Sequence, residues 1–303
     1  MAGKFLRSLG IALGAFLTST RAFAAEGQPA PGEVGLQDSV TPIGDSIHTF
    51  HNGILLWTAV LVSLLVLALL VIVILRFNAR TNPTPARFTH NTLVEVIWTA
   101  LPVIILVIIA IPSFAILTDQ MTMPDGQRKY LGSNIFSFGS VDVPAPAITV
   151  KVTGSQWYWT YEYVDQQKSF DSNILSEEAR LAQTPQQPRL LAIDNMLVVP
   201  VNTTVRVQVT AADVIHAFAV PSFGIITDAV PGRLNETWFN ARKEGVYYGQ
   251  CRELCGKDHA FMPIAVRVVS QDVFDAWMKA FQAGSIADAN ATLPPVSAEQ
   301  PAA

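Results

Sequence analysis

The sequence predicts a membrane-anchored all-β protein, in which a two-helix transmembrane hairpin precedes a β-sandwich or β-barrel. Half of the 303 residues are hydrophobic and only 15% are charged, which is unusual for a chain that lies wholly in water. Residues 53–75 and 96–117 contain no charged side chain, and each stretch can cross the ~30 Å hydrocarbon core as a helix. From Ile148 onward, short runs rich in β-branched and aromatic residues alternate with turn residues, a pattern typical of strands.

The first 25 residues predict a cleaved signal peptide. Basic residues precede the short apolar stretch Leu9–Leu17, and the small-x-small triplet Ala22–Ala24 follows it, as in a secretory signal with its cleavage site. A retained anchor is the alternative, and it is disfavoured because the apolar stretch is shorter than the ~20 residues that a span needs. Residues 26–52 would then form an extracytoplasmic N-terminal segment.

The loop between the two spans predicts the topology of the hairpin, residues 53–117. It carries Arg76, Arg80 and Arg87 and no acidic residue, so the positive-inside tendency places it in the cytoplasm. Both ends of the hairpin then face the other side, in agreement with a signal peptide. We therefore expect a multi-pass protein of a bacterial-type inner (plasma) membrane, with everything after about Thr118 on the periplasmic side.

The remaining segments follow from composition. Residues 118–147 contain Gly and Pro breaks without a clear period and are assigned as a linker, and residues 148–283 form the β-domain. Within that domain no helix is expected before Gln271–Ala283, whose apolar residues share one face of an amphipathic helix. Residues 284–303, rich in Ala, Pro and Ser, are expected to be disordered. The net charge of −4 without a run of Lys or Arg excludes nucleic acid as a partner and leaves membrane lipid and proteins.

The stretch GQCRELCGKDHAFMP, Gly249–Pro263, contains both cysteines of the chain. Cys251, Cys255, His259 and Met262 form the pattern C-x3-C-x3-H-x2-M. Thiolate, imidazole and thioether together favour copper over zinc, calcium or magnesium. The spacing alone also allows a disulfide, which is the usual state of paired cysteines in an oxidising compartment.

A single copper does not account for all of these ligands. A mononuclear blue-copper site uses one Cys, two His and a weak axial Met, so it has no use for a second thiolate. His216, at the start of a predicted strand, is the natural remote imidazole. Two cysteines, two histidines and one methionine suit two coppers that share both sulfurs.

At these residues the chain resembles a known family. The stretches VIHAFAVPSFGIITDAVPGRLN and YYGQCRELCGKDHAFMPIAV are similar to the binuclear copper (CuA) motif of cytochrome c oxidase subunit II, and the similarity extends from about His48 to Ala280. The resemblance implies a helix hairpin followed by an extracytoplasmic cupredoxin-like domain. The ligands that it implies are Cys251 and Cys255 as bridges between two copper ions, His216 and His259 as caps, and Met262 with the main-chain carbonyl of Glu253 as weak ligands.

The same resemblance implies a function. The chain would be subunit II of a haem-copper cytochrome c oxidase, accepting electrons from cytochrome c and passing them to haem in subunit I, with subunit III as a further partner. Oxygen would be reduced to water there while protons cross the membrane. One alternative is a quinol oxidase subunit that uses the same scaffold without metal, which the intact ligands disfavour. Another is a copper donor to a nitrogen-oxide reductase, which the copurifying catalytic subunit would distinguish.

The run GSQWYWTYEY suggests where electrons enter. The resemblance identifies Trp157 as the residue beneath the docked cytochrome, although related oxidases often have His where this chain has Ser155. Strand alternation would place Trp157, Trp159 and Tyr161 on one face. The alternative for these aromatic residues is a role in the core.

Acidic residues near these segments are candidates for docking cytochrome c, which presents lysines around its haem edge. Exposed carboxylates commonly serve only solvation, and Lys168 interrupts the set. The candidates are Glu162, Asp165, Asp171, Asp194 and Asp213.

Two further glutamates have implied roles. In the family, the side chain that matches Glu253 reaches a Mg or Mn ion at the interface with subunit I, and a single carboxylate supplemented by water suits such an ion. Glu95 lies at the cytoplasmic start of the second span, where ionisable groups are often functional. The resemblance makes Glu95 a candidate for proton uptake, and a boundary residue that reaches the interface is the alternative.

Overall fold

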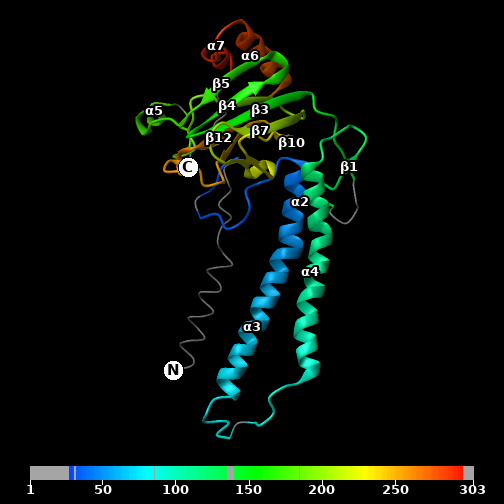
Figure 1. Cartoon of the computed structure of the whole chain (residues 1–303). Helices are drawn as coiled ribbons and strands as arrows, with labels where there is room; N and C mark the ends of the chain where they lie inside the picture. The colour runs from blue at the N-terminus through cyan, green and yellow to red at the C-terminus, as the bar shows by residue number, and fades with distance from the viewer. Residues whose placement is uncertain (1–26, 31, 85, 135–139, 184, 296–303) are drawn as a thin grey trace.

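A long helical hairpin carries a β-domain at one end, and the loop that joins the two helices lies at the other end (Figure 1). The computed structural model describes residues 27–295 except 31, 85, 135–139 and 184. The predicted signal peptide therefore lies outside the described residues.

The hairpin consists of two helices long and apolar enough to span a membrane, Pro42–Arg76 and Thr92–Met121. The first comprises α2 (Pro42–Phe50), a π-helical turn η1 (His51–Leu55) and α3 (Leu56–Arg76), and the second is α4 (Thr92–Met121). The prediction of two spanning helices is confirmed. Both helices extend beyond the uncharged stretches, because capped polar residues at the ends still form helical hydrogen bonds.

The β-domain is built from a five-stranded sheet and a three-stranded sheet, with a two-stranded ribbon beside them. The five-stranded sheet has the order β10–β7–β3–β4–β5 and the smaller one β11–β12–β6, while β8 pairs with β9. The β3/β7 and β12/β6 pairs are parallel and the others antiparallel. The strands are β3 (Ile148–Ser155), β4 (Tyr158–Tyr163), β5 (Lys168–Ser172), β6 (Leu197–Pro200), β7 (Thr204–Ala211), β8 (His216–Val220), β9 (Ile225–Ala229), β10 (Asn235–Asn240), β11 (Gly245–Gln250) and β12 (Pro263–Val269).

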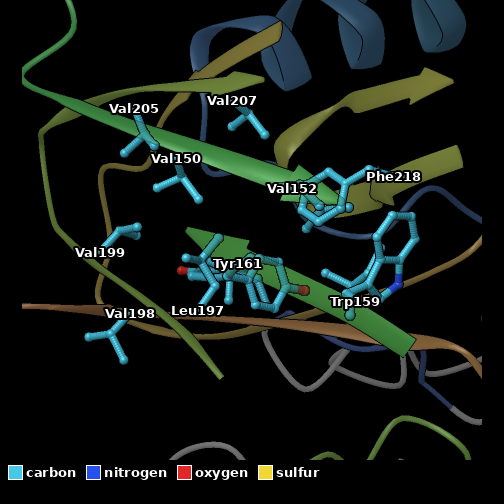
Figure 2. Close-up of a cluster of buried hydrophobic side chains, with 14 of the residues drawn as sticks. Val150, Val152, Trp159, Tyr161, Leu197, Val198, Val199, Val205, Val207 and Phe218 are labelled. Carbon is cyan, nitrogen blue, oxygen red and sulfur yellow. The ribbon is translucent and has the colours of Figure 1, made fainter. Parts of the chain in front are cut away.

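Alternating residues of both sheets meet in one core, part of which Figure 2 shows. The β4 side chains Trp159, Tyr161 and Tyr163 are fully buried, and the Trp159 ring packs edge-on against Phe218 with centroids 5.6 Å apart. Trp157 lies in the turn between β3 and β4 rather than on β4, and its half-buried ring packs against the same core. The predicted β-sandwich is confirmed, and strand alternation does not account for the position of Trp157.

Several short elements depart from the sequence prediction. A helix α5 (Glu177–Leu181) interrupts the β-domain, and β1 (Lys129–Tyr130) pairs with β2 (Val141–Asp142) inside the segment assigned as a linker. Elements of two to five residues are too short to show a periodic pattern. Single 3₁₀ turns also occur at η2 (Val164–Gln166), η3 (Pro221–Phe223) and η4 (His259–Phe261).

The C-terminal segment is ordered further than its composition indicated. The predicted helix is present as α6 (Gln271–Ala283), and a second helix α7 (Ile286–Asn290) follows it. Ala289 is fully buried, and Trp277 Nε1 donates a hydrogen bond to Asn290 Oδ1 at 3.1 Å. The expectation of disorder from residue 284 is therefore wrong as far as residue 295, because tertiary contacts hold this segment; residues 296–303 lie outside the described residues.

Polar contacts fix the β-domain on the end of the hairpin. Trp238 Nε1 of β10 donates to the main-chain oxygen of Asp119 in α4 at 3.0 Å, and the buried Asp119 carboxylate pairs with Arg128 at 2.8 Å. Arg242 forms a two-pronged ion pair with Asp45 of α2, with bonds of 2.7 and 2.9 Å. The β-domain is therefore held at a defined position on the end of the hairpin.

Candidate metal centre

The candidate metal centre lies where the loop between β11 and β12 meets the start of β8. Cys251 follows the end of β11, and its amide donates to the main-chain oxygen of Met262 at 3.0 Å, which closes the loop. The amide of Arg252 donates to the oxygen of Ala217 in β8 at 3.2 Å. These backbone bonds bring His216, the first residue of β8, to the two cysteines.

Two glycines allow this close approach. A Cβ at position 249 would lie 1.9 Å from the main-chain oxygen of Ala219, so only glycine lets β11 approach β8. A Cβ at Gly154 would lie 3.0 Å from the ring of His216. The role of neither glycine is evident from the sequence, because a glycine within a strand indicates a close backbone contact but not its partner.

The ligand-type atoms converge. Cys251 Sγ lies 3.9 Å from Cys255 Sγ and 3.9 Å from His216 Nδ1, while Cys255 Sγ lies 3.5 Å from His259 Nδ1. The main-chain oxygen of Glu253 is 3.3 Å from Cys251 Sγ. Both cysteines are free, and a sulfur separation of 3.9 Å is far longer than the ~2.05 Å of a disulfide.

Among the described residues, one group of three His, Cys, Asp or Glu side chains could hold a metal ion. It consists of His216, Cys251 and Cys255, whose ligand atoms lie within 4.8 Å of one another. All three are buried, whereas His259 is half-buried. Met262 is also buried. The expected ligand positions are thus gathered at one end of the sandwich.

The electrostatics of the pair favour a bound cation. Burial, together with the neighbouring Cys251 thiol, raises the pKa of Cys255 to about 12. Two thiolates side by side are therefore disfavoured unless a positive charge compensates them. A metal ion supplies that charge and deprotonates coordinating thiols.

Asp213 is a neighbour of the site, and its contacts are not evident from the sequence. Its carboxylate lies 2.9 Å from His216 Nε2 and accepts the amide of Gln156 at 2.7 Å. Burial alone would raise the pKa of Asp213, but the hydrogen bonds from His216 and from the amides of Gln156 and Val214 hold it below its ordinary value. The only sequence signal was an acid three residues before a candidate ligand.

Trp157 packs on the residues that follow Cys255. A Cβ at Gly256 would lie 3.0 Å from the Trp157 ring, and Lys257 Nζ lies 5.6 Å from its centroid. The preceding residue, Gln156, donates from Nε2 to the main-chain oxygen of Cys255 at 2.7 Å. The half-buried indole therefore lies directly beside the β11–β12 loop, which carries Cys251 and Cys255.

The structure separates the docking candidates into two groups. Asp171 pairs with Thr160 at the Trp157 end of β4, and Asp194 accepts the amide of Asn173 just beyond β5 at 2.8 Å; Asp213 contacts the Trp157 turn itself. Glu162 lies further along β4 than Thr160, and Asp165 lies beyond the end of that strand. Glu162 also lies 3.6 Å from Lys151.

The remaining two glutamates lie away from the converging ligands. The side chain of Glu253 is exposed. Glu95 accepts the amide of Asn91 at 3.1 Å, which completes the cap of α4, and it lies on one open face of that helix together with Thr92, Val96, Thr99, Ala100, Val103 and Ile104.

Comparisons with known proteins identify relatives of this chain. The family model of the periplasmic domain of cytochrome c oxidase subunit II matches residues 148–269, and that of its transmembrane domain matches residues 29–116. A probable cytochrome c oxidase subunit 2 from Rickettsia bellii is 47% identical over 275 residues, covering 90% of this chain and 93% of the relative. Cytochrome c oxidase subunit 2 from Triticum aestivum is 44% identical over 271 residues, covering 87% of this chain and 93% of the relative.

A solved structure is similar to the β-domain. The periplasmic domain of subunit II of the Bradyrhizobium japonicum cytochrome oxidase is 58% identical, with a TM-score of 0.41, and the match covers 45% of this chain and 94% of that chain.

Fold and site together define a membrane-anchored β-sandwich protein with a buried His/Cys/Cys cluster that can hold a metal. The chain belongs to the cytochrome c oxidase subunit II family. It is accordingly a subunit of a cytochrome oxidase, an oxidoreductase complex, with a periplasmic-type domain on a transmembrane hairpin.

Proposed function

We propose that this chain accepts electrons from cytochrome c at a binuclear copper centre and passes them to haem in subunit I of a haem-copper oxidase. One observation carries the proposal. Two imidazole–thiol pairs, His216 with Cys251 and His259 with Cys255, face each other across a sulfur separation of 3.9 Å.

The spacing of these atoms suits metal ligands. With bonds of roughly 2.0–2.3 Å, two ligands at a tetrahedral metal lie about 3.5–3.8 Å apart, and the sulfur–nitrogen and sulfur–sulfur distances here are 3.5 to 3.9 Å. Each histidine is next to a different cysteine, which supports two ions over one. A bound copper pair would share a single electron over two metals in a rigid frame, which favours fast electron transfer.

The chain's own residues keep that frame rigid and dry. Cys251, Cys255, His216 and His259 would hold the ions. Met262 and the main-chain oxygen of Glu253 would supply weak further contacts. Their positions are fixed by strand ends and by buried surroundings, which limit both movement and water access.

Electrons would enter through Trp157, whose ring packs on Gly256 directly after the ligand Cys255. Docking of cytochrome c would involve Asp171, Asp194 and Asp213, because these acids lie toward the Trp157 end of the sandwich. Glu162 and Asp165 would contribute only longer-range attraction to a basic partner.

Two proposals concern the hairpin and the subunit interface. Glu95, on an open face of α4, would take up protons for subunit I, and the exposed side chain of Glu253 would reach a Mg or Mn ion. The other ligands of that Mg or Mn ion would come from water and from subunit I. Subunit III would complete the complex in a bacterial-type inner membrane, with residues 1–25 removed as a signal peptide.

The test uses the full chain purified in detergent, reduced and loaded with copper. We expect two copper ions per chain and an electron paramagnetic resonance spectrum of one electron shared by two copper nuclei. One copper with an ordinary four-line spectrum would contradict the binuclear proposal. Failure to bind copper after reduction would leave the chain as a scaffold only, as in a quinol oxidase.

A further inference from the structure

Asp213, in the loop between β7 and β8, contacts both the candidate ligand His216 and the turn that carries Trp157. Oδ1 lies 2.9 Å from His216 Nε2 and accepts the amide of Val214 at 2.7 Å. Oδ2 accepts the amide of Gln156 at 2.7 Å. Its two carboxylate oxygens thus contact a candidate ligand and the turn that carries Trp157.

The contact to His216 decides which ring nitrogen can bind a metal. The two carboxylate oxygens of Asp213 already accept the backbone amides of Val214 and Gln156, so the carboxylate is the acceptor in the contact with His216 and the ring nitrogen Nε2 is the donor. The lone pair is then on Nδ1, the atom that lies 3.9 Å from Cys251 Sγ. A carboxylate behind a metal-binding histidine fixes its tautomer and ring orientation in this way.

Gln156 extends the same connection to the other cysteine. Its amide bonds to Asp213, and its side-chain Nε2 donates to the main-chain oxygen of Cys255 at 2.7 Å. The adjacent backbone is fixed by the bond from the Ala212 amide to the Gly154 oxygen at 2.9 Å. The turn carrying Trp157 is therefore bonded to both the His216 side and the Cys255 side of the sulfur pair.

We propose that Asp213 and Gln156 are positioning residues: they fix the metal-binding tautomer of His216 and hold the Trp157 turn against the Cys255 loop. Metal retention and electron input then depend on the same pair of side chains. This inference rests on the proposed copper function. It also gives Asp213 a role that the docking candidates Asp171 and Asp194 cannot share, because neither contacts a ligand.

The first experiment compares Asp213→Ala and Asp213→Asn in the copper-loaded full chain, with chelator competition to measure copper affinity. Loss of a partner behind a ligand weakens metal binding by about 10- to 100-fold, and we expect this for Asp213→Ala, with an altered copper hyperfine pattern. Asp213→Asn keeps one acceptor oxygen and should lie between the wild type and Asp213→Ala.

The matched control is Asp171→Asn, which removes one negative charge near the same end of the sandwich. It should weaken the salt dependence of reduction by cytochrome c while leaving copper affinity and the resonance spectrum unchanged. If Asp213 is only a docking charge, Asp213→Asn and Asp171→Asn will behave alike in every measurement, and the proposal is overturned.

Gln156→Ala tests the second half of the proposal. It should slow reduction by cytochrome c without changing the salt dependence, because no charge is lost and the Trp157 turn is released from Cys255. Gln156→Glu keeps an acceptor in place of the donor and should not restore the rate. Wild-type rates in both variants would remove Gln156 from the proposal.

The outcomes separate this inference from the proposed function. A wild-type chain without the shared-electron spectrum would reject the copper function itself. A wild-type chain with that spectrum, and an Asp213→Ala variant of equal copper affinity and spectrum, would reject only the positioning role. Should Asp213→Ala fail to fold by circular dichroism, the comparison of Asp213→Asn with Asp171→Asn decides the question.

Discussion

The hairpin exposes its apolar side chains, whereas the β-sandwich buries them. In α3 no residue is buried within the chain, and Leu67 is 56% exposed. In the sandwich, Val207 at the centre of β7 is fully buried. The sandwich therefore supplies its own apolar environment, whereas the hairpin requires lipid or a partner subunit to cover it.

This difference explains where a rigid metal centre can be placed. The ligand-bearing loops extend from strands that the chain itself holds in register, so their geometry does not depend on the membrane. The hairpin provides attachment, and its link to the sandwich combines polar contacts near Asp119 and Arg242 with an apolar cluster in which Ile43 of α2 packs with Trp238 of β10. Substitutions confined to one region test whether the sandwich folds and holds its ligands independently of the hairpin.

The largest effect is expected when the same charge is placed in each region. Val207→Asp buries an unpaired carboxylate, which costs several kcal/mol against a typical total stability of ~5–15 kcal/mol, so the sandwich should unfold by near-ultraviolet circular dichroism. Leu67→Asp should leave the sandwich folded and disfavour membrane insertion by about 3 kcal/mol, measured as the extractable fraction. Equal loss of the sandwich signal in both variants would contradict the independence of the two regions.

The next largest effect is confined to the metal loop. If the proposed copper function holds, Cys251→Ser abolishes copper-pair binding and reduction by cytochrome c, because a hydroxyl replaces one of the two thiolates that would hold the ions, while the sandwich melts as before. Copper content and the resonance spectrum provide the measurement. Leu254→Ala is the control, since Leu254 lies between the cysteines and is 77% exposed; it should keep the full copper content.

Removing the aromatic ring beside the loop should affect the rate alone. We expect Trp157→Ala to retain copper and to slow electron input at least about tenfold, which corresponds to ~1.4 kcal/mol in the barrier. Stopped-flow reduction by cytochrome c measures this rate. Tyr158→Phe, at the next position, should react as the wild type does, and a normal rate for Trp157→Ala would move electron input elsewhere.

In the hairpin, Glu95→Gln separates proton uptake from helix capping. Glutamine keeps the oxygen that accepts the Asn91 amide but cannot carry a proton at neutral pH. We expect slower oxygen reduction by the assembled oxidase, with an unchanged copper spectrum. An unchanged rate would assign Glu95 to the cap of α4, and Asn91→Ala, which removes the other half of the cap, provides the structural control.

The smallest effect is expected at the junction of the two regions. The Arg242–Asp45 pair is two-pronged, but the Arg242 side chain is 47% exposed, so water screens it and Arg242→Ala should cost no more than ~1 kcal/mol. A decrease of only about 2–4 °C in the melting temperature of the sandwich corresponds to that value. Lys151→Ala, which removes a pair within the sheet, is the comparison, and a far larger effect of Arg242→Ala would show that the hairpin stabilises the sandwich.

The sequence by itself determined the features that depend on neighbours along the chain. Uncharged stretches of spanning length predict the hairpin because each helix satisfies its own backbone hydrogen bonds in lipid. The spacing of Cys251, Cys255, His259 and Met262 predicts a metal loop because the ligand types lie within a few residues of one another. The β-rich composition after Ile148 predicted the sandwich for the same local reason.

Only the tertiary structure decided the features that depend on contacts between distant segments. It placed His216 beside Cys251 through the close approach of β8 and β11 at Gly249, put Trp157 in a turn, and brought Asp213 to that turn. It also placed the Asp213 carboxylate against the ring of His216. Strand pairing and side-chain packing set these positions, and both arise from long-range contacts that local sequence patterns do not encode.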